Sequence, residues 1–309
     1  MQKRVLLISN PIAGDRKTDL LSRWFVRTLE QSGHEVETFV TASADDIHHR
    51  VRRLEPEGER LVVAGGDGTI NQVLNGLRDP ALIPLFILPT GTANVLANEL
   101  GLPRSLGAAV QIFEQAHIRH LDMGLVGKRR FLSMLSAGVD AMVTQELIGG
   151  KGRIRGYWRY VFPFLKVILR YKPPRLQVQV DSSDRLAGSH VLVSNVRRYG
   201  SGLKFAHRAY CDSGHFDVCI FPKRSFFSLC RYYLVALLGK PSWQTGVIYL
   251  TGRRIRIDST DRVPVQIDGD YLGTTPVEVE LRPSLVPIIV PDPSRMSRKT
   301  PGQTTLIEP

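Results

Sequence analysis

The sequence predicts a doubly wound α/β domain followed by a mainly antiparallel β domain. Up to about residue 120, short apolar runs alternate with helical stripes, which is typical of a parallel sheet covered on both faces. Beyond that point strand-like stretches dominate, and 309 residues are enough for two domains with separate cores. We therefore expect an α/β domain at residues 1–121, a β domain at 122–290, and a tail at 291–309 that is disordered or packs back.

Each element of the first domain has its own pattern. The strands are predicted as apolar runs at residues 5–8, 36–40, 61–64 and 85–88. The helices are predicted from apolar residues at helical spacing within 21–29, 47–54, 70–77, 93–100 and 106–113. Ser43 and Ser105 stand where helix caps are expected, and Gly33 and Gly101 stand where two of the helices should end.

The second domain is predicted from strand-like stretches interrupted by two helical regions. These stretches cover residues 121–126, 130–137, 176–180, 190–196, 216–221, 254–258, 263–267, 277–281 and 285–290. The longest apolar run, residues 226–238, contains Arg231 and is shorter than the roughly 20 residues that span a bilayer, so we expect it in the core.

A glycine-rich turn, Gly65-Gly66-Asp67-Gly68-Thr69, separates the third strand from its helix. Its glycines let the backbone approach a ligand, and the N–H groups at a helix start can bind phosphate oxygens. Asp67 is the one formal charge in the turn. Beside bound phosphates it would be repelled unless a cation lay between, which predicts a phosphate-bridged Mg²⁺. The alternative is a turn in which Asp67 is only a helix cap.

A second turn, Thr90-Gly91-Thr92-Ala93-Asn94, follows the next strand. Two such turns on neighbouring strands favour a polyphosphate site, because the carboxyl ends of parallel strands share one edge of the sheet. Asn10 and Thr41 would lie at the same edge. The sequence contains neither a Walker-type loop nor a protein-kinase His-Arg-Asp loop.

The composition indicates the class of binding partner but does not identify a single one. The formal net charge of +12 favours a nucleotide, a nucleic acid or an anionic membrane surface. We find no motif of RNA- or DNA-binding proteins. The three cysteines lack CxxC spacing, and their odd number suits a reducing cytoplasm better than a disulfide framework. The apolar start of the chain is too short for a signal peptide and is interpreted as a first strand.

Together these motifs resemble the diacylglycerol kinase catalytic-domain family, which includes bacterial lipid kinases and sphingosine kinases. The resemblance rests on the two turns with Asn71, Asn75 and Gly76, and extends over roughly residues 4–290. Its later matches are Asp122-Met-Gly, residues 131–140, Tyr199-Gly-Ser-Gly-Leu, the stretch from Asp212 to Val218, and Asp268-Gly-Asp-Tyr. It implies a nucleotide domain like those of NAD kinase and phosphofructokinase, a β-sandwich domain, and an active site between them.

The resemblance implies ATP as phosphate donor, Mg²⁺, and a diacylglycerol-like lipid hydroxyl as acceptor. The implied nucleotide-binding residues are Asn10, Gly14, Thr41, Gly65, Gly66, Asp67, Gly68, Thr69, Asn71, Thr90, Gly91, Thr92 and Asn94. The implied catalytic residues are Asp67 and Asp270, the latter standing where the family usually has a glutamate base. The alternative for Asp268-Gly269-Asp270 is a simple hairpin turn.

The metal residues implied by the resemblance are Asp67, Asp122, Asp212 and Ser213. Family members usually have an aspartate at the position of Ser213, where it helps to hold a Mg²⁺ that links the domains. A hydroxyl is a poor substitute for that carboxylate, so either Asp212 reaches across or the site is weakened or lost. The alternative role for Asp122 and Asp212 is turn capping.

A basic and aromatic segment lies between Glu146 and Asp181, where no acidic residue occurs. Cations alternating with aromatic side chains favour peripheral contact with an anionic membrane surface. The alternative is a helix packed on the β domain, with its apolar residues in the core and its cations solvated.

The leading hypothesis is thus an ATP-dependent lipid kinase in the cytoplasm with peripheral membrane association. A soluble-substrate kinase of the NAD kinase type is the nearest rival, because NAD kinases share the first turn. A catalytically weakened nucleotide- or lipid-binding homologue is the third. The sequence leaves a homodimer open and does not name the lipid.

Overall fold

The computed structural model describes residues 4–293 except 11–15, 42, 56–58, 150–162, 164–165, 168–169, 171, 201, 224 and 241–244. Gly14, most of the basic and aromatic segment, and nearly all of the predicted tail therefore lie outside the described residues.

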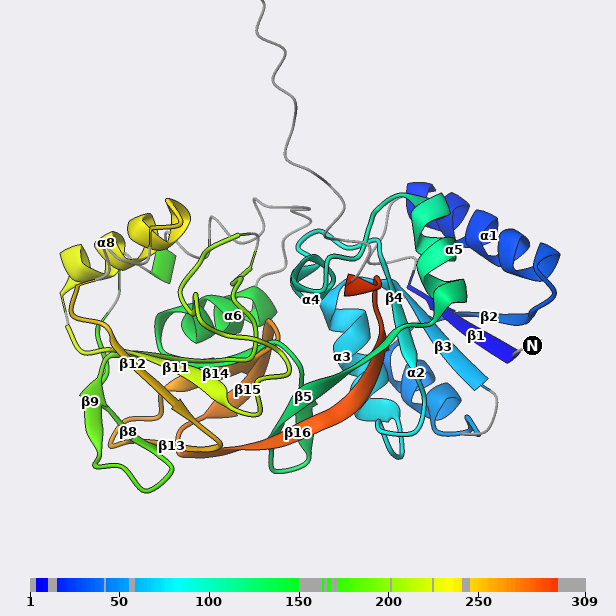
Figure 1. The fold of residues 1–309 in the computed structure, drawn as a ribbon. Coiled ribbons are helices and arrows are strands. Elements are labelled where there is room, and N and C mark those ends of the chain that lie inside the picture. Colours follow the sequence, from blue (N-terminus) through cyan, green and yellow to red (C-terminus); the bar gives the residue numbers. More distant parts are fainter. Residues whose placement is uncertain are drawn as a thin grey trace, which may run out of the picture.

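The helices and strands alternate in the first half, and strands dominate the second (Figure 1). The first half comprises β1 (Arg4–Ser9), α1 (Arg16–Gln31), β2 (Glu35–Val40), α2 (Ala44–Val51), β3 (Glu59–Gly65), α3 (Asp67–Gly76), β4 (Leu85–Pro89), α4 (Val95–Glu99), α5 (Leu106–Gln115) and β5 (Ile118–Val126). The second comprises β6 (Arg129–Phe131), β7 (Met134–Ala137), α6 (Val139–Gly149), β8 (Leu176–Val180), β9 (Leu186–Gly188), β10 (His190–Ser194), β11 (Phe216–Phe221), α8 (Phe226–Leu237), β12 (Ile248–Gly252), β13 (Arg254–Ser259), β14 (Pro264–Ile267), β15 (Asp270–Thr274) and β16 (Val277–Ile289).

The first domain is built on a parallel sheet in the order β2-β1-β3-β4. Helices cover both faces: α1 packs with α5, and α2 packs with α3 (Figure 1). The central strands are apolar because both faces are covered, and Leu61 to Ala64 are fully buried. Helix α2 begins as predicted, with the Ser43 hydroxyl accepting a hydrogen bond from the N–H of Asp46 at 3.2 Å.

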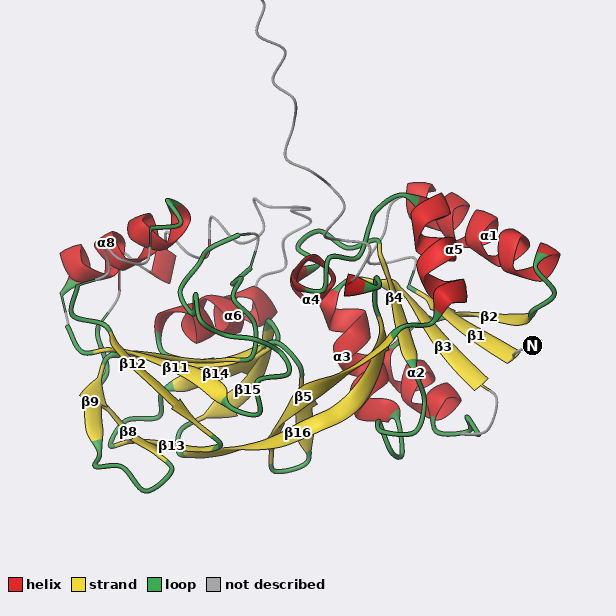
Figure 2. Ribbon diagram, viewed as in Figure 1, coloured by secondary structure: helices red, strands yellow, loops and turns green. Residues whose placement is uncertain are grey.

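The second domain is a sandwich of two mainly antiparallel sheets (Figure 2). One sheet has the order β12-β11-β10-β7-β14-β15, and the other contains β13, β8 and β9. Alternate residues of facing strands fill the space between them, such as Val178 and Ile257 on one side and Val193 and Ile220 on the other. The two-domain fold predicted from the sequence is confirmed.

One long strand joins the two domains. The sequence pattern predicted two strands, at 277–281 and 285–290, but the structure has a single strand, β16, with a register shift between Arg282 and Val286. Its first residues pair with β13, and Ile288 near its end pairs in parallel with Leu85 of β4. One ten-stranded sheet therefore runs through both domains, and the boundary expected near residue 122 falls inside β5.

Two other expectations are corrected. The stretch 130–137 is not one strand, because the chain breaks between β6 and β7 at Leu132 and Ser133. The run 226–238 is not wholly in the core, because the α8 helix buries one face and exposes apolar side chains on the other. In the part of the chain that the structure describes, no helix has the length and hydrophobicity needed to cross a bilayer.

Candidate active site

The two glycine turns meet at their backbones. Thr90 donates its N–H to the carbonyl oxygen of Gly65 at 3.2 Å, which places the turns side by side at the carboxyl ends of β3 and β4. A Cβ on Gly91 would lie 2.4 Å from the Cα of Gly66. Any side chain at Gly91 would therefore force the turns apart, so the contact explains why glycine stands there.

Asn94 holds the second turn in shape. Its Oδ1 accepts the N–H of Gly91 at 3.0 Å and its Nδ2 donates to the carbonyl oxygen of Gly91 at 2.7 Å. The residue is buried and has a left-handed φ of 47°. A left-handed conformation is unusual outside glycine but is tolerated by asparagine. Its role is thus to shape the turn.

The other residues predicted to bind the nucleotide lie at different places around the two turns. Asn10, at the end of β1, donates from Nδ2 to Thr69 Oγ1 at 3.4 Å, which brings it to the first turn. Thr41 is buried at the end of β2, and its hydroxyl donates to the Ser43 carbonyl oxygen at 2.6 Å. Gly68 and Thr92 are exposed at the surface of the two turns.

Asp67 caps the helix that follows the second turn. Its two carboxylate oxygens accept the N–H groups of Val95 at 3.1 Å and Leu96 at 3.2 Å, at the start of α4. Asn94, the N-cap residue of α4, makes no capping bond of its own. Burial raises the pKa of Asp67 above its ordinary value, although these hydrogen bonds oppose the shift. The cap alternative concerned the helix that follows the first turn, but the N-cap of α3 is Gly66 without a side-chain capping bond, and Asp67 caps α4 instead.

The geometry at the two turns fits a phosphate group. The Thr90 hydroxyl is buried and has no hydrogen-bond partner among the described residues. The start of α3 lies next to it, where helix geometry leaves N–H groups without intrahelical partners. Each carboxylate oxygen of Asp67 uses one lone pair on a backbone N–H and keeps others. Asp67 therefore fits a Mg²⁺ held mainly by nucleotide phosphates and water.

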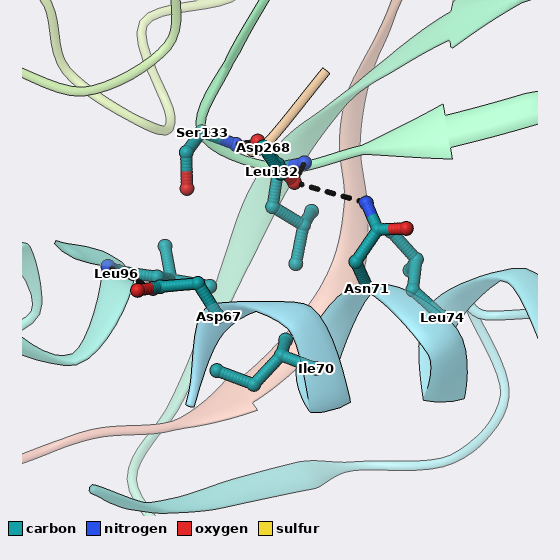
Figure 3. Close-up of a pocket in the computed structure, with 8 residues that line it drawn as sticks. All are labelled: Asp67, Ile70, Asn71, Leu74, Leu96, Leu132, Ser133 and Asp268. Atoms are coloured by element: carbon teal, nitrogen blue, oxygen red, sulfur yellow. Dashed lines mark hydrogen bonds between the residues drawn. The ribbon is translucent and has the colours of Figure 1, made fainter. Parts of the chain in front are cut away.

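A small pocket lies between the two domains beside this site (Figure 3). It is lined by Asp67, Ile70, Asn71, Leu74, Leu96, Leu132, Ser133 and Asp268. Four of the eight lining residues are aliphatic and four are polar, and the two carboxylates come from different domains, one from the start of α3 and one from the β14–β15 turn.

Asp268 is fixed by four hydrogen bonds. It accepts the N–H groups of Leu132, Ser133 and Met134 at 2.9 to 3.0 Å. It also accepts the side-chain N–H of Asn71 at 3.2 Å (Figure 3). Burial nevertheless raises its pKa to about 6. A carboxylate with all these donors serves to hold the turn in place. Sequence reasoning named Asp268 only as part of a motif, because the break between β6 and β7 that supplies the donors was not predicted.

Asp270 is the first residue of β15 and is half-buried. It is not among the residues that line the pocket. Burial raises its pKa, and the positive charge of Arg129 lowers it in part. The Nε of Arg129 is buried with no hydrogen-bond partner in the described part of the chain. A carboxylate with a raised pKa is a better proton acceptor, so the predicted role as base stays open to test.

Helix α3 is fastened to β6 by two asparagines. Asn75 accepts the N–H of Arg130 at 2.8 Å and donates to its carbonyl oxygen at 2.9 Å. Asn71 donates to the same carbonyl oxygen at 3.3 Å. The Arg130 guanidinium in turn donates to the carbonyl oxygens of Leu74 and Leu77 at 2.9 and 2.7 Å, at the end of α3. The family motif Asn71–Asn75 thus joins the domains.

A buried chain of polar groups runs from α6 to the turn that carries Asp270. The Ser136 hydroxyl donates to Asp140 at 2.5 Å, and the Tyr199 hydroxyl donates to the same carboxylate oxygen. Gln266 donates to Ser136 at 2.8 Å and accepts the N–H of Gly269 at 2.7 Å. These bonds fix the backbone beside Asp270. Sequence reasoning did not predict them, because the residues come from four separate segments.

The residues assigned to a domain-linking Mg²⁺ do not fit one. Asp122 is buried and accepts backbone N–H groups from Gly214 and Ser284 at 2.7 and 2.8 Å. Both oxygens of Asp212 accept the Arg119 guanidinium at 2.6 Å, which lowers the pKa of Asp212. The Ser213 hydroxyl donates to a backbone carbonyl at 2.9 Å. Within the described residues, no group of three or more His, Cys, Asp or Glu side chains is arranged to hold a metal ion.

Two family models match nearly the whole chain. The model described as "Diacylglycerol kinase catalytic domain" matches residues 4–126, and "YegS C-terminal NAD kinase beta sandwich-like domain" matches residues 133–290.

Individual proteins are also similar to this chain over most of its length. The diacylglycerol kinase of Bacillus subtilis is 27% identical over 283 residues, covering 89% of this chain and 92% of the relative. That of Staphylococcus epidermidis is 26% identical over 279 residues, covering 89% and 88%. A crystal structure of a diacylglycerol kinase from Bacillus anthracis aligns with a TM-score of 0.76 at 23% identity, covering 95% of this chain and 98% of that one. The last comparison shows a shared fold.

Proposed function

We propose that this chain, which belongs to the diacylglycerol kinase catalytic-domain family, transfers the γ-phosphate of ATP to the hydroxyl of a diacylglycerol-like lipid. Membership in the family makes the chain an enzyme of the lipid-kinase type. The observation that carries the finer proposal is the contact between the two glycine turns, beside a pocket whose lining comes from both domains.

The nucleotide phosphates would bind over the two turns. The Thr90 hydroxyl and the N–H groups at the start of α3 would donate to phosphate oxygens. Gly66 and Gly91 allow the backbone to come close. Mg²⁺, held by Asp67 and the phosphates, would neutralise phosphate charge when bound. The cap bonds to Val95 and Leu96 hold the Asp67 carboxylate in position.

The acceptor hydroxyl would lie at the junction of the two domains, within reach of Asp270 and beside the small pocket, which Asp270 does not line. The Asp270 carboxylate takes the proton of that hydroxyl as its oxygen bonds to the γ-phosphorus. The bond from the γ-phosphorus to the bridging oxygen breaks, ADP leaves, and the product is a phosphorylated lipid. A positioned base of this kind contributes about 10²- to 10⁴-fold, and alignment and charge neutralisation supply most of the remaining rate enhancement.

The family match favours a lipid over a soluble acceptor such as NAD. Four of the eight residues that line the pocket beside the site are aliphatic, namely Ile70, Leu74, Leu96 and Leu132. A lipid acceptor also requires contact with a bilayer, which we propose to be peripheral and to involve an anionic surface.

A screen of purified lipids tests the proposal. The protein would be incubated with ATP and Mg²⁺ and with single lipids that differ in headgroup, and the products would be identified by mass. We expect a mass gain of one phosphate on a diacylglycerol. Phosphorylation of none of the hydroxyl-bearing lipids would contradict the proposed activity.

A further inference from the structure

Helix α8 carries apolar side chains on two opposite faces. On the inner face, Tyr232 packs against Phe221 of β11 with ring centroids 5.0 Å apart, and Ala236 is fully enclosed. The outer face carries four large apolar side chains that are exposed to solvent. Their exposed fractions are 81% for Phe227, 56% for Leu234, 67% for Leu237 and 53% for Leu238. We call these four residues the α8 stripe.

The α8 stripe is continuous along the helix. Phe227, Leu234 and Leu238 are spaced i, i+7 and i+11, which places them on one line, and Leu237 lies beside that line. A folded chain gains stability by burying such residues, and the inner face already supplies the contacts that hold the helix on its sheet. An exposed apolar surface of this kind marks a place where another apolar surface binds.

The groups around the α8 stripe are positively charged. Lys204 and Lys240 are exposed and lie at the end of the helix, where their backbone N–H groups bond to the carbonyl oxygens of Ala236 and Val235. Lys223 is exposed just before the helix, and Arg231 is exposed within it. No aspartate or glutamate occurs in the sequence between residues 217 and 258. Apolar side chains edged by cations are complementary to an anionic lipid surface.

We propose that the outer face of α8 binds an anionic phospholipid bilayer, with the α8 stripe at the acyl boundary and the lysines against the headgroups. The inference rests on the proposed lipid-kinase function, which requires the enzyme to take its acceptor from a membrane. It places the contact on residues that the sequence pattern assigned to the core. The helix lies flat on the outside of the sandwich, the orientation that interfacial binding needs (Figure 1).

Vesicle co-sedimentation with the full chain, in the absence of nucleotide, tests the proposal. The double variant Leu234→Gln and Leu238→Gln removes two members of the α8 stripe at exposed positions. Leu82→Gln is the matched control, because Leu82 is 51% exposed in the first domain. On vesicles of phosphatidylcholine with phosphatidylglycerol, we expect the double variant to need about tenfold more lipid for half-binding, and the control to match the wild type. Equal binding by the double variant and the wild type would overturn the proposal.

The lysines around the α8 stripe have their own test. The double variant Lys204→Gln and Lys223→Gln should bind these vesicles more weakly, and its binding should depend less on salt than that of the wild type. Lys128→Gln, an exposed position in the turn between β5 and β6, is the control. Wild-type binding that is equal on vesicles of phosphatidylcholine alone would contradict the role of the lysines.

Two further measurements distinguish a membrane-binding surface from a subunit interface and from a part of the active site. Light scattering of the free protein should give the same mass for wild type and the Leu234 and Leu238 variant; a dimer that the variant dissociates would identify the surface as a subunit interface and overturn the proposal. Turnover of a short-chain, water-dispersed diacylglycerol should be equal in both, since these residues lie outside the site. If the α8 variant binds vesicles more weakly than the wild type but no lipid is phosphorylated, the membrane-binding role of α8 is supported and the proposed kinase activity is contradicted.

Discussion

Asn71 and Asp268, which are 197 positions apart in the sequence, are hydrogen-bonded across the domain junction at 3.2 Å. Asn71 lies on the helix that begins with Asp67, and Asp268 lies in the turn that leads to Asp270. The bond therefore links the helix that starts at the phosphate site to the turn that carries the proposed base. Its loss should affect stability and the relative position of Asp67 and Asp270, the two proposed catalytic residues.

Replacing Asn71 should destabilise the protein in a pH-dependent way. The Asn71 side chain lowers the pKa of Asp268, so Asn71→Ala should raise that pKa above its present value of about 6. A carboxyl group with a raised folded-state pKa contributes stability below its unfolded pKa and loses it as pH rises through the folded pKa. The loss from Asn71→Ala should thus be larger at pH 7.5, about 1.5 to 3 kcal/mol, than at pH 5.

Urea unfolding at the two pH values measures this difference. Asn98→Ala is the control, because Asn98 is exposed and its side chain donates to a backbone carbonyl within its own turn. Equal destabilisation by Asn71→Ala at both pH values would show that the pKa of Asp268 does not depend on its hydrogen bond to Asn71.

Gly91→Ala should separate the two glycine turns. A Cβ at this position would lie 2.4 Å from the Gly66 Cα and 2.8 Å from Asn94 Oδ1, so the backbone has to shift. We expect a large loss of ATP affinity, measured by calorimetry. Gly107→Ala is the control, since no atom lies within 4 Å of a Cβ there and the residue is in helix α5. Unchanged ATP binding by Gly91→Ala would rule out the two glycine turns as the phosphate-binding site.

Asp67→Ala should reduce both activity and stability. The structure adds a stability cost to the expected loss of turnover, because the carboxylate caps α4. Loss of a helix cap costs about 1 kcal/mol, which urea unfolding can detect. Near-normal turnover of Asp67→Ala in a kinase assay would show that Asp67 has no role at the phosphate site. An unchanged free energy of unfolding would show that its cap bonds to α4 do not stabilise the protein.

The acid limb of the pH profile of kcat/KM should depend on Arg129. Burial raises the pKa of Asp270 and the Arg129 charge lowers it in part, so Arg129→Gln should raise this pKa further. A base works in its ionised form, and the acid limb of kcat/KM should therefore move to higher pH in Arg129→Gln. Asp270→Asn should abolish most of the turnover, about 10²-fold or more, with little change in ATP affinity. An acid limb that stays in place in Arg129→Gln would argue against Asp270 as the base.

Chelation should leave the link between the domains intact. Both oxygens of Asp212 are held by the Arg119 guanidinium, which leaves only Asp122 of the two assigned carboxylates for a linking Mg²⁺. The unfolding temperature should not change with EDTA. Because the Arg119–Asp212 pair is partly exposed, Arg119→Gln should cost no more than about 1 kcal/mol. A clear fall of the unfolding temperature with EDTA would mean that a metal holds this region together.

The sequence predicts elements that depend on local pattern. The Ser43 cap, the buried strand predicted at 61–64, which lies within β3, and the helical stripe from Ile70 to Leu77 are all found in the structure. They could be predicted because hydrophobic periodicity, capping and glycine turns act over a few residues. The two turns could be placed together because parallel strands share their carboxyl ends.

What the sequence does not predict depends on contacts between distant segments. At the break, the N–H groups of Leu132 and Ser133 bond to Asp268, which lies more than 130 positions away, and no local signal marks it. The Arg119–Asp212 pair joins residues 93 positions apart. The apolar run of α8 does not show how many faces of the helix are buried, because this depends on which other segments pack around it.

A lipid is the proposed acceptor at the site between the domains, and a direct competition between acceptors tests it. A single incubation of the purified protein would contain [γ-³²P]ATP, Mg²⁺, NAD and extracted membrane lipid. We predict label in the lipid fraction, as phosphorylated diacylglycerol, and none in NADP, with the label lost in Asp270→Asn. Label that appears in NADP and not in the lipid fraction would contradict the lipid-kinase function.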